Sequence, residues 1–341
     1  MHVFVICRNS LIAMTAVAVG VPVAAASPSP EIGHDSGSQA TIASAKSRFP
    51  IGSSALIDVS VATLWREPRI HRRLDLPALA DPVKLGKWNR QLRTAAQRRW
   101  LVGRVQTQAL YGQQVLVREV RGSWIKVAVI DQPEPQDPAG YPGWLPARQL
   151  IPKGDMLQIV DDSEHLVVRA KKTRLQTPTG KVAVGYGTRL LPTSPESHSK
   201  WIEVETPRGP GRIKSAAVSE PMELTARSVL REGRRFMGLR YLWGGLSAWG
   251  MDCSGLLWNI FRAHGKTIPR DADPQFRSGG KVSLKKMKPG DFIFWGSQNY
   301  AHHVAIYVGK NKMLEAPDSS GRVRVVPVRW NEVAGSRRFI R

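Results

Sequence analysis

The chain has 341 residues, which allows two or three compact domains at about 150 residues per domain. Hydrophobic residues make up 42% of it and charged residues 23%, which excludes intrinsic disorder over most of the chain. Fifty Lys and Arg against 27 Asp and Glu give a net charge of +23, which favours an acidic partner: nucleic acid, an anionic membrane or an anionic wall polymer. Two cysteines are too few for a disulfide scaffold or a zinc ribbon.

The N-terminus has the pattern of a secretory signal. Arg8 is the single Lys, Arg, Asp or Glu before Glu31, and the apolar run over 11–24 leads into Ala24-Ala25-Ala26, an A-x-A cleavage pattern. The run is short for a membrane span, and an uncleaved anchor helix is the alternative. We predict a signal peptide over 1–26 and a secreted, extracellular or cell-wall-associated protein without a membrane span in the mature chain. Cys7 would leave with the signal, so Cys253 would have no intramolecular partner.

Two small all-β units are predicted after the signal. Residues 27–50 are rich in Ser, Ala, Gly and Pro, which predicts a flexible linker. From 51 to about 220, short β-like runs alternate with Gly, Pro and Asp. The run Ser123-Trp-Ile-Lys-Val127 recurs as Lys200-Trp-Ile-Glu-Val204, and each copy is followed by a Gly-led run. This weak repeat predicts tandem barrels over 51–152 and 153–220.

Residues 85–100 form a predicted helical insertion in the first unit. Apolar and long side chains recur there at helical spacing, on a face made by Trp88, Leu92, Ala95, Ala96 and Arg99. The opposite, exposed side is strongly basic. The sequence contains no recognisable nucleic-acid-binding signature, so we predict no nucleic-acid partner and favour teichoic acid or an acidic glycan.

Cys253 is predicted at the start of a helix. Short strand-like runs give way to a helix-like pattern near Pro221, which predicts a third domain over 221–341. A glycine-rich stretch runs to Gly250-Met-Asp-Cys-Ser-Gly-Leu256, and residues 253–264 then show helical spacing up to Gly265. At a helix N-terminus the dipole and the free N–H groups favour a thiolate, and they also stabilise an oxyanion formed by its attack on a carbonyl.

His303 and Glu315 are the predicted partners of this thiol. His303 lies on a β-like run, and Glu315 lies on the next one, after a turn at Lys310-Asn311. Because side chains alternate along a strand, the two share a face only if the loop has an odd number of residues. We therefore expect an odd loop, with Glu315 orienting the His303 imidazole. His302 points to the other side of the strand.

Four segments resemble the NlpC/p60 family of bacterial cell-wall cysteine peptidases. They are Tyr241-Leu-Trp-Gly-Gly, Asp252-Cys-Ser-Gly, Pro289-Gly-Asp291 before a Phe-Ile-Phe strand, and His303-Val-Ala-Ile-Tyr-Val-Gly309. The resemblance covers about residues 222–341 in the family's order. It implies a papain-like core with Cys253 as nucleophile, His303 as base and Glu315 at the third position, where the family most often has His.

The N-terminal part is similar to a subgroup with bacterial SH3-like domains before the peptidase, notably in Ala62-Thr-Leu-Trp-Arg-Glu-Pro68. That subgroup resembles γ-D-glutamyl-L-diamino acid endopeptidases of the dipeptidyl-peptidase VI type, which cut peptidoglycan stem peptides. The resemblance implies that Tyr241, Asp252 and Ser254 bind substrate, with Asp252 pairing with a free N-terminal amine. Relatives often have Glu where Gln113 follows Gly112 here, so the strictness of the amine requirement stays open.

Other polar residues are interpreted as structural. The stretch with Arg270, Asp271, Asp273 and Gln275 resembles the family's Pro-Arg-Asp segment, but solvated loop charges or a local salt bridge are the simpler interpretation. No metal site is predicted, because the cysteine and the nearby histidines lack the spacing of a closed ligand set.

The predicted fold class is therefore α+β, with a papain-like NlpC/p60 domain preceded by two small all-β SH3-like barrels. The predicted reaction is hydrolysis of γ-D-glutamyl-diamino acid bonds through a Cys253 thioester, without a cofactor. Alternatives are an amidase or acyltransferase on the same fold, or a catalytically inert wall-binding protein. We predict peptidoglycan stem peptides and anionic cell-wall polymers as partners of a monomer.

Overall fold

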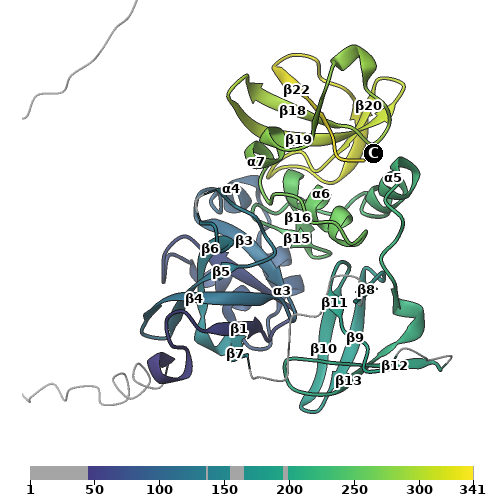
Figure 1. Ribbon diagram of the computed structural model, residues 1–341. Helices are drawn as coiled ribbons and strands as arrows, with labels where there is room; N and C mark the ends of the chain where they lie inside the picture. Colours follow the sequence, from purple (N-terminus) through teal and green to yellow (C-terminus); the bar gives the residue numbers. More distant parts are fainter. Residues whose placement is uncertain (1–44, 136, 154–164, 195–198, 341) are drawn as a thin grey trace, which may run out of the picture. The chain divides into compact units, whose positions relative to one another are not determined.

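The computed structural model describes residues 45–135, 137–153, 165–194 and 199–340 (Figure 1). The predicted signal peptide over 1–26, with Cys7, and the linker residues 27–44 lie outside the described residues. The last residues of the predicted linker are packed: Ala45 and Phe49 are buried, and Phe49 belongs to the core of the first sheet. The packed chain therefore begins before Ile51.

A seven-stranded antiparallel sheet fills the first part of the described chain, in the order β3-β2-β6-β5-β4-β1-β7. Its strands are β1 (Ser54–Ile57), β2 (Val61–Trp65), β3 (Val105–Leu110), β4 (Gln114–Arg121), β5 (Trp124–Val129), β6 (Tyr141–Pro146) and β7 (Leu150–Pro152). The order is open, with β3 and β7 at its edges, so no closed barrel is formed by the described strands. A short 3-10 turn, η2 (Ala147–Gln149), links β6 to β7.

The insertion between β2 and β3 contains several short helices rather than one. They are η1 (Arg73–Asp75), α2 (Leu76–Leu79), α3 (Leu85–Gln91) and α4 (Ala95–Arg99). Thr94 and Gln97 form a capping box that starts a new helix at Ala95, so the helical spacing of α3 does not continue into α4. As a result Trp88 and Leu92 are buried as predicted, but Arg99 is exposed and Arg98 is buried in its place.

Two smaller sheets follow in the next part of the chain. One has the order β10-β9-β13-β12 and the other the order β11-β8-β14. Their strands are β8 (Leu166–Val168), β9 (Lys172–Thr177), β10 (Gly180–Gly185), β11 (Arg189–Leu190), β12 (Trp201–Val204), β13 (Gly211–Lys214) and β14 (Val218–Ser219), with η4 (Ser215–Ala217) before β14.

The sequence repeat corresponds to a repeated local structure. In the first copy, β5 begins at Trp124 and pairs with β6, which leads through η2 to β7. In the second copy, β12 begins at Trp201 and pairs with β13, which leads through η4 to β14. The same order of hairpin, 3-10 turn and short strand thus occurs twice.

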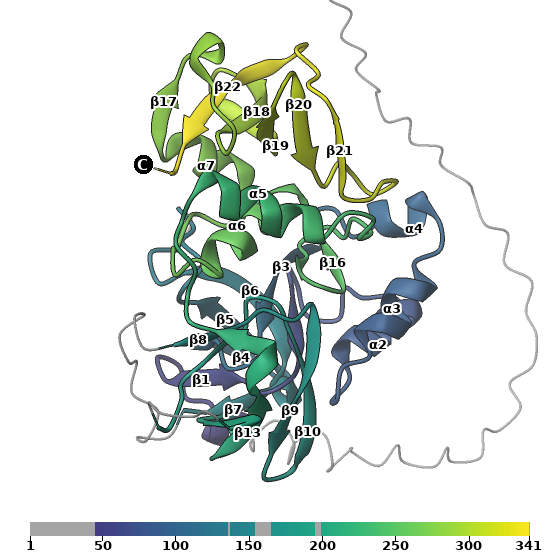
Figure 2. The same cartoon turned by 90° about the vertical axis from the view of Figure 1, so that its right-hand side faces the viewer.

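The C-terminal part is a mixed α/β region that consists mostly of strands. A six-stranded antiparallel sheet has the order β17-β22-β18-β19-β20-β21 (Figure 2). Its strands are β17 (Gly280–Val282), β18 (Phe292–Ser297), β19 (Tyr300–Gly309), β20 (Lys312–Glu315), β21 (Arg324–Pro327) and β22 (Val333–Arg338). The other elements of this region are α5 (Ala226–Arg235), the hairpin of β15 (Leu246–Ser247) and β16 (Gly250–Met251), α6 (Cys253–Arg262), α7 (Ala272–Arg277) and η5 (Leu284–Lys286). Helices α6 and α7 pack against β19.

One hydrophobic core joins the first sheet to the C-terminal region. It contains Trp65 and Trp88 from the N-terminal half, and Leu256 of α6 and Val304 of β19 from the C-terminal half. None of the helices in the described part of the chain is long and apolar enough to cross a membrane.

Candidate active site

Cys253 is the first residue of α6, which confirms the predicted helix start. Asp252 is the N-cap residue, and its carboxylate accepts a hydrogen bond of 2.7 Å from the N–H of Gly255. Gly255 is required at its position, because a Cβ there would lie 2.2 Å from the carbonyl oxygen of Gly245. The sequence Asp-Cys-Ser-Gly therefore specifies a tight helix start with the Cys253 thiol beside the N-terminal end of the helix dipole.

The turn between β19 and β20 has two residues, Lys310 and Asn311. Both have positive φ, 49° and 56°, as a type I′ hairpin turn requires. The expected odd-numbered loop is therefore wrong.

His303 and Glu315 nevertheless share a face, because a β-bulge at Val308 adds one residue to β19. Gly309 pairs with Lys312, but the next pair is Tyr307 with Met313, so the register shifts by one. An extra residue in the strand changes the alternation of side chains as an extra loop residue would.

Glu315 accepts a hydrogen bond from the His303 ring. The distance from His303 Nε2 to Glu315 Oε2 is 2.9 Å, and Glu315 is fully buried. An ionised carboxylate can only accept, so Nε2 carries the proton and Nδ1 remains for the Cys253 side. Burial alone lowers the pKa of His303, but the hydrogen bonds and negative charges of Cys253 and Glu315 outweigh it and raise that pKa to about 9.

Two arginines that the sequence analysis did not identify hold Glu315. Arg324 at the start of β21 donates two hydrogen bonds to Oε1, from Nε at 3.1 Å and from Nη2 at 3.0 Å. Arg329 donates to both oxygens, to Oε1 at 2.9 Å and to Oε2 at 2.8 Å. Burial of the carboxyl raises the pKa of Glu315, but the hydrogen bonds from His303 and Arg329 reverse this and hold its pKa well below the usual range. Glu315 is therefore a stable anion beside His303.

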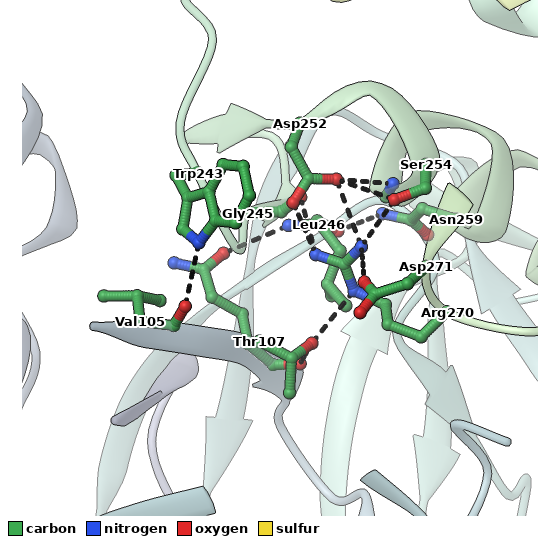
Figure 3. Close-up of polar contacts among 12 residues, drawn as sticks. Val105, Thr107, Trp243, Gly245, Leu246, Asp252, Ser254, Asn259, Arg270 and Asp271 are labelled. Carbon is green, nitrogen blue, oxygen red and sulfur yellow. Dashed lines mark hydrogen bonds and ion pairs between the residues drawn. The ribbon is translucent and has the colours of Figure 1, made fainter. Parts of the chain in front are cut away.

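Arg270 is fully buried beneath the start of α6, contrary to the solvated interpretation of its loop (Figure 3). Its Nη2 lies 2.8 Å from Asp252 Oδ2 and its Nη1 lies 3.1 Å from Asp252 Oδ1. The same guanidinium donates to Ser254 Oγ at 3.1 Å and, through Nε, to Thr107 Oγ1 of β3 at 2.9 Å. The local salt bridge that the sequence left open as an interpretation is thus present, but in the interior.

The three predicted substrate-binding residues lie around Cys253, with different freedom to bind. Asp252 already has a buried guanidinium as its charge partner, so a substrate amine would compete with Arg270 for it. Ser254 is also engaged by Arg270. Tyr241 lines the cavity at Cys253, and its burial, with the nearby charges of Cys253 and Asp252, raises its pKa well above the ordinary value. Of the three, Tyr241 retains a neutral hydroxyl group for a ligand.

Two cavities meet at Cys253, which lines both. The first has a volume of about 460 Å³ and is rich in carboxylates. Its acidic lining residues are Glu134, Asp252, Asp271 and Asp273. The second has a volume of about 910 Å³ and contains His303, Arg324 and Arg329 together with Asp318 and Glu332. A chain molecule that crosses Cys253 therefore meets different charges on its two sides.

Gln113 does not line either of these cavities. Its amide oxygen accepts from the N–H of Leu110, and its amide nitrogen donates to Asp131. It borders a separate cavity of about 190 Å³. The acidic lining near Cys253 comes instead from the loop with Glu134 and from the start of α7, where Asp271 accepts a 2.6 Å hydrogen bond from Tyr141 of β6.

Comparisons with known proteins agree with the resemblance seen in the sequence. A model of the NlpC/P60 family matches residues 238–336. The Gamma-D-glutamyl-L-lysine dipeptidyl-peptidase of Bacillus cereus is 34% identical over 310 residues, which cover 84% of this chain and 91% of that protein. The protein of the same name from Bacillus subtilis is 31% identical over 274 residues, which cover 78% of this chain and 91% of that protein.

Structural comparison gives the same result. The crystal structure of an NlpC/P60 family protein from Bacillus cereus has a TM-score of 0.79 to this structure at 34% identity, and covers 85% of this chain and 100% of that chain. Sequence and structure are thus matched over most of both proteins, well beyond the catalytic motifs. The chain belongs to the NlpC/P60 family.

Proposed function

We propose that this protein is a secreted cysteine endopeptidase that hydrolyses γ-D-glutamyl-diamino acid bonds in peptidoglycan stem peptides. The observation that carries the proposal is the alignment of Cys253 at a helix N-terminus with His303 and a buried, ionised Glu315. The names of the Bacillus relatives support the bond, because they are Gamma-D-glutamyl-L-lysine dipeptidyl-peptidases. Further relatives are named peptidoglycan endopeptidases.

The proposed reaction proceeds in two steps. His303 takes the thiol proton of Cys253 on Nδ1, the sulfur attacks the γ-carbonyl carbon, and the N-terminal end of α6 stabilises the oxyanion. His303 gives its proton to the leaving amine, the C–N bond breaks and a thioester remains on Cys253. Water then attacks the thioester with His303 as base, which releases the carboxylic acid and restores the thiol. Glu315 keeps the proton on Nε2 and stabilises the imidazolium in both steps.

A cavity lies on each side of Cys253, so a substrate can extend in both directions from the bond that is cut. This supports cleavage within a peptide chain. We assign the amine end of the substrate to the carboxylate-lined cavity. Asp271 and Asp273 are its candidate partners in preference to Asp252, because Arg270 makes two short contacts to Asp252 but lies 3.5 Å from Asp271, and Asp273 is paired with the exposed Arg277. A free N-terminal L-Ala amine would then be recognised independently of Gln113.

The remaining assignments of the sequence belong to the same proposal. We infer secretion from the signal pattern over 1–26, a monomer, and two SH3-like modules over 51–152 and 153–220 that precede the peptidase over 221–341. The twofold occurrence of hairpin, 3-10 turn and short strand supports the modules. The net charge of +23 supports anionic wall polymers as partners.

The decisive test is mass spectrometry of L-Ala-γ-D-Glu-diaminopimelate peptides incubated with the mature protein. We expect wild type to release L-Ala-D-Glu, and Cys253→Ala to release none. Lys281→Gln is the control and should retain activity, because Lys281 is exposed on β17 and lines neither cavity at Cys253. An N-acetylated peptide tests whether the free N-terminal amine of the substrate is recognised. Transfer of the acyl group to an added amine would reveal an acyltransferase. If neither peptides nor intact peptidoglycan are cut, the inert wall-binding alternative replaces this proposal.

A further inference from the structure

Arg329 contacts both groups that hold the His303 ring. Its guanidinium donates to both carboxylate oxygens of Glu315, including Oε2, the atom that accepts from His303. It also lies over the Trp295 ring at 5.3 Å from the centroid, and the Trp295 and His303 rings are 5.4 Å apart. In return, the Trp295 indole N–H donates to the carbonyl oxygen of Arg329 at 2.7 Å. Trp295 and Glu315 are both buried, so these contacts are sheltered from water.

Arg324 provides an internal comparison. It carries the same charge, contacts the same carboxylate and is equally half-exposed, with 49% of its side chain exposed against 47% for Arg329. However, it donates only to Oε1, the oxygen that does not face His303. The two arginines thus differ in geometry and not in charge.

We propose that Arg329 is a positioning residue of the active site, which fixes His303 through Glu315 on one side and Trp295 on the other. This inference deepens the proposed function, because it takes Cys253 and His303 as the reacting pair. A bidentate guanidinium restricts the rotation of a carboxylate, whereas a single-oxygen contact leaves it free to turn. Loss of the Arg329 guanidinium would free Oε2 and remove the cation over the Trp295 ring, while the backbone hydrogen bond to the indole stays, and His303 would be held less firmly.

The test compares Arg329→Gln with Arg324→Gln in the full mature chain. For Arg329→Gln we expect kcat to fall by about 10- to 100-fold, the range seen when outer partners of a functional histidine are removed, with little change in KM. Arg324→Gln should lower kcat by a smaller factor than Arg329→Gln, because Oε2, the oxygen that accepts from His303, keeps its arginine. Arg329→Lys should be intermediate, since it restores the charge without the fork.

A spectroscopic readout separates positioning from a general structural defect. The Nε2 proton of His303, held by a carboxylate, should give a low-field signal in the proton NMR spectrum of histidine-labelled protein, identified by its loss in His303→Ala. We expect this signal to disappear in Arg329→Gln and to persist in Arg324→Gln. Equal behaviour of the two variants in rate and in spectrum would overturn the inference. If wild type cuts no peptide, the proposed function fails, but the spectra still decide the role of Arg329.

A separate observation concerns the basic groove, which we define as the groove of about 740 Å³ between η1, α2 and α3. Its charged lining residues are Arg72, Arg73, Lys84 and Lys87, and no acidic side chain lines it. Arg72 is paired with the buried Asp75, but the other three are exposed and make no ion pair with any described residue. Between residues 82 and 104 the sequence has seven Lys and Arg and no Asp or Glu.

The floor of the groove restricts its partner. Leu76, Pro77 and Ala80 line it between the cations, so it is partly apolar. A flexible chain with alternating phosphates and short carbon units matches cations separated by apolar patches. We infer that the basic groove binds a linear polyol-phosphate polymer.

The test measures binding of fluorescent oligo(glycerol phosphate) to the full mature chain near 0.15 M salt. A triple variant, Arg73→Gln, Lys84→Gln and Lys87→Gln, should raise Kd by about 10- to 100-fold. The matched control replaces three exposed lysines elsewhere, Lys281, Lys285 and Lys286, by Gln, and so has the same net charge. It should raise Kd by less than about threefold. Equal losses in the two triples, or tighter binding to anionic vesicles or single-stranded DNA, would overturn the inference.

Discussion

Glu315 is a fully buried carboxylate with three cationic neighbours, His303 from β19, Arg324 from β21 and Arg329 beyond it. Asp318 in the following loop is a further anion, because its hydrogen bonds with Ser320 lower its pKa although the charge of Glu315 raises it. With two permanent cations beside it, Glu315 stays ionised in the pH range where the enzyme would act. Its charge is therefore available to His303 throughout that range.

Glu315→Gln should move the alkaline limit of activity. Glu315 contributes to the raised pKa of His303, about 9, and the imidazolium that protonates the leaving amine is lost as the pH rises through that value. The neutral amide lowers the pKa of His303, so the alkaline limb of kcat/KM should shift to lower pH and kcat should fall. The measurement is the pH profile of peptide hydrolysis, with the exposed Lys281→Gln as the control that keeps its limb near pH 9. An unchanged limb in Glu315→Gln would contradict this role.

Breaking the buried pair of Arg270 and Asp252 should cost far more stability than breaking an exposed pair. Arg270 is fully buried, and its removal leaves the Asp252 carboxylate beneath α6 without its cation. We expect Arg270→Met to lower the free energy of unfolding by about 3–5 kcal/mol, measured by urea denaturation. The control is Arg277→Gln, which breaks a pair with Asp273 at a side chain that is 59% exposed and should cost less than about 1 kcal/mol. Equal losses would show that burial is not the source of the effect.

At the scale of elements, the sequence predicted the segments that carry strong local signals. The glycine-rich stretch and the spacing after Cys253 predicted α6 with its correct first residue, and alternation predicted β19. The sequence carries no local signal for the bulge at Val308. β-branched residues such as valine are common in regular strands, and the bulge arises from the pairing of β19 with β20. The predicted odd loop was wrong for this reason, although the shared face of His303 and Glu315 was predicted.

The partners of Glu315 and the burial of Arg270 were missed for a related reason. Arg324 is the first residue of β21, and Arg329 follows this strand. Only the position of β21 beside β20 in the sheet brings them to the carboxylate of Glu315. Arg270 is a charged loop residue in sequence, and charged residues are seldom fully buried unless they are paired. Its partners Asp252 and Thr107 are 18 and 163 residues away. Local patterns carry no information on such contacts.

The turn at Lys310 and Asn311 joins the strands that carry His303 and Glu315, and it is a site of backbone strain. Lys310 has φ of 49°, a conformation that costs about 1–2 kcal/mol for most residues but nothing for Gly. Lys310→Gly should therefore raise the free energy of unfolding by up to about 1 kcal/mol, after the entropy of the flexible unfolded chain is subtracted. Lys310→Val should lower it, because a β-branched residue fits this region least well. Urea denaturation of both variants measures the effect, and a change of the same sign in both would contradict the turn geometry.

At the scale of the molecule, the first sheet takes part in building the active site. Trp243 beside Cys253 donates its indole N–H to the carbonyl oxygen of Val105 at 2.9 Å. Gln108, fully buried on β3, accepts from the N–H of Leu246 at 3.3 Å and from Ser247 Oγ at 3.1 Å. Arg270 bonds Thr107 of the same strand. Strand β3 thus supports the residues that surround Cys253, and similarity to the Bacillus relatives likewise extends far beyond the motifs around Cys253 and His303.

Because the first sheet and the C-terminal region share one core and these buried hydrogen bonds, we expect them to unfold together. Hydrogen exchange with mass spectrometry at increasing urea can follow peptides from β4–β5 and from β18–β19 separately. Their midpoints should coincide in wild type.

Gln108→Leu removes the partner of two buried donors and should lower both midpoints together. The control Gln97→Leu changes a partly exposed glutamine in the capping box of α4 and should have a smaller effect on both. Two well-separated midpoints in wild type would show that the peptidase region stays folded after the sheet has unfolded. The contacts of β3 would then affect the binding of substrate but not the stability of the active site.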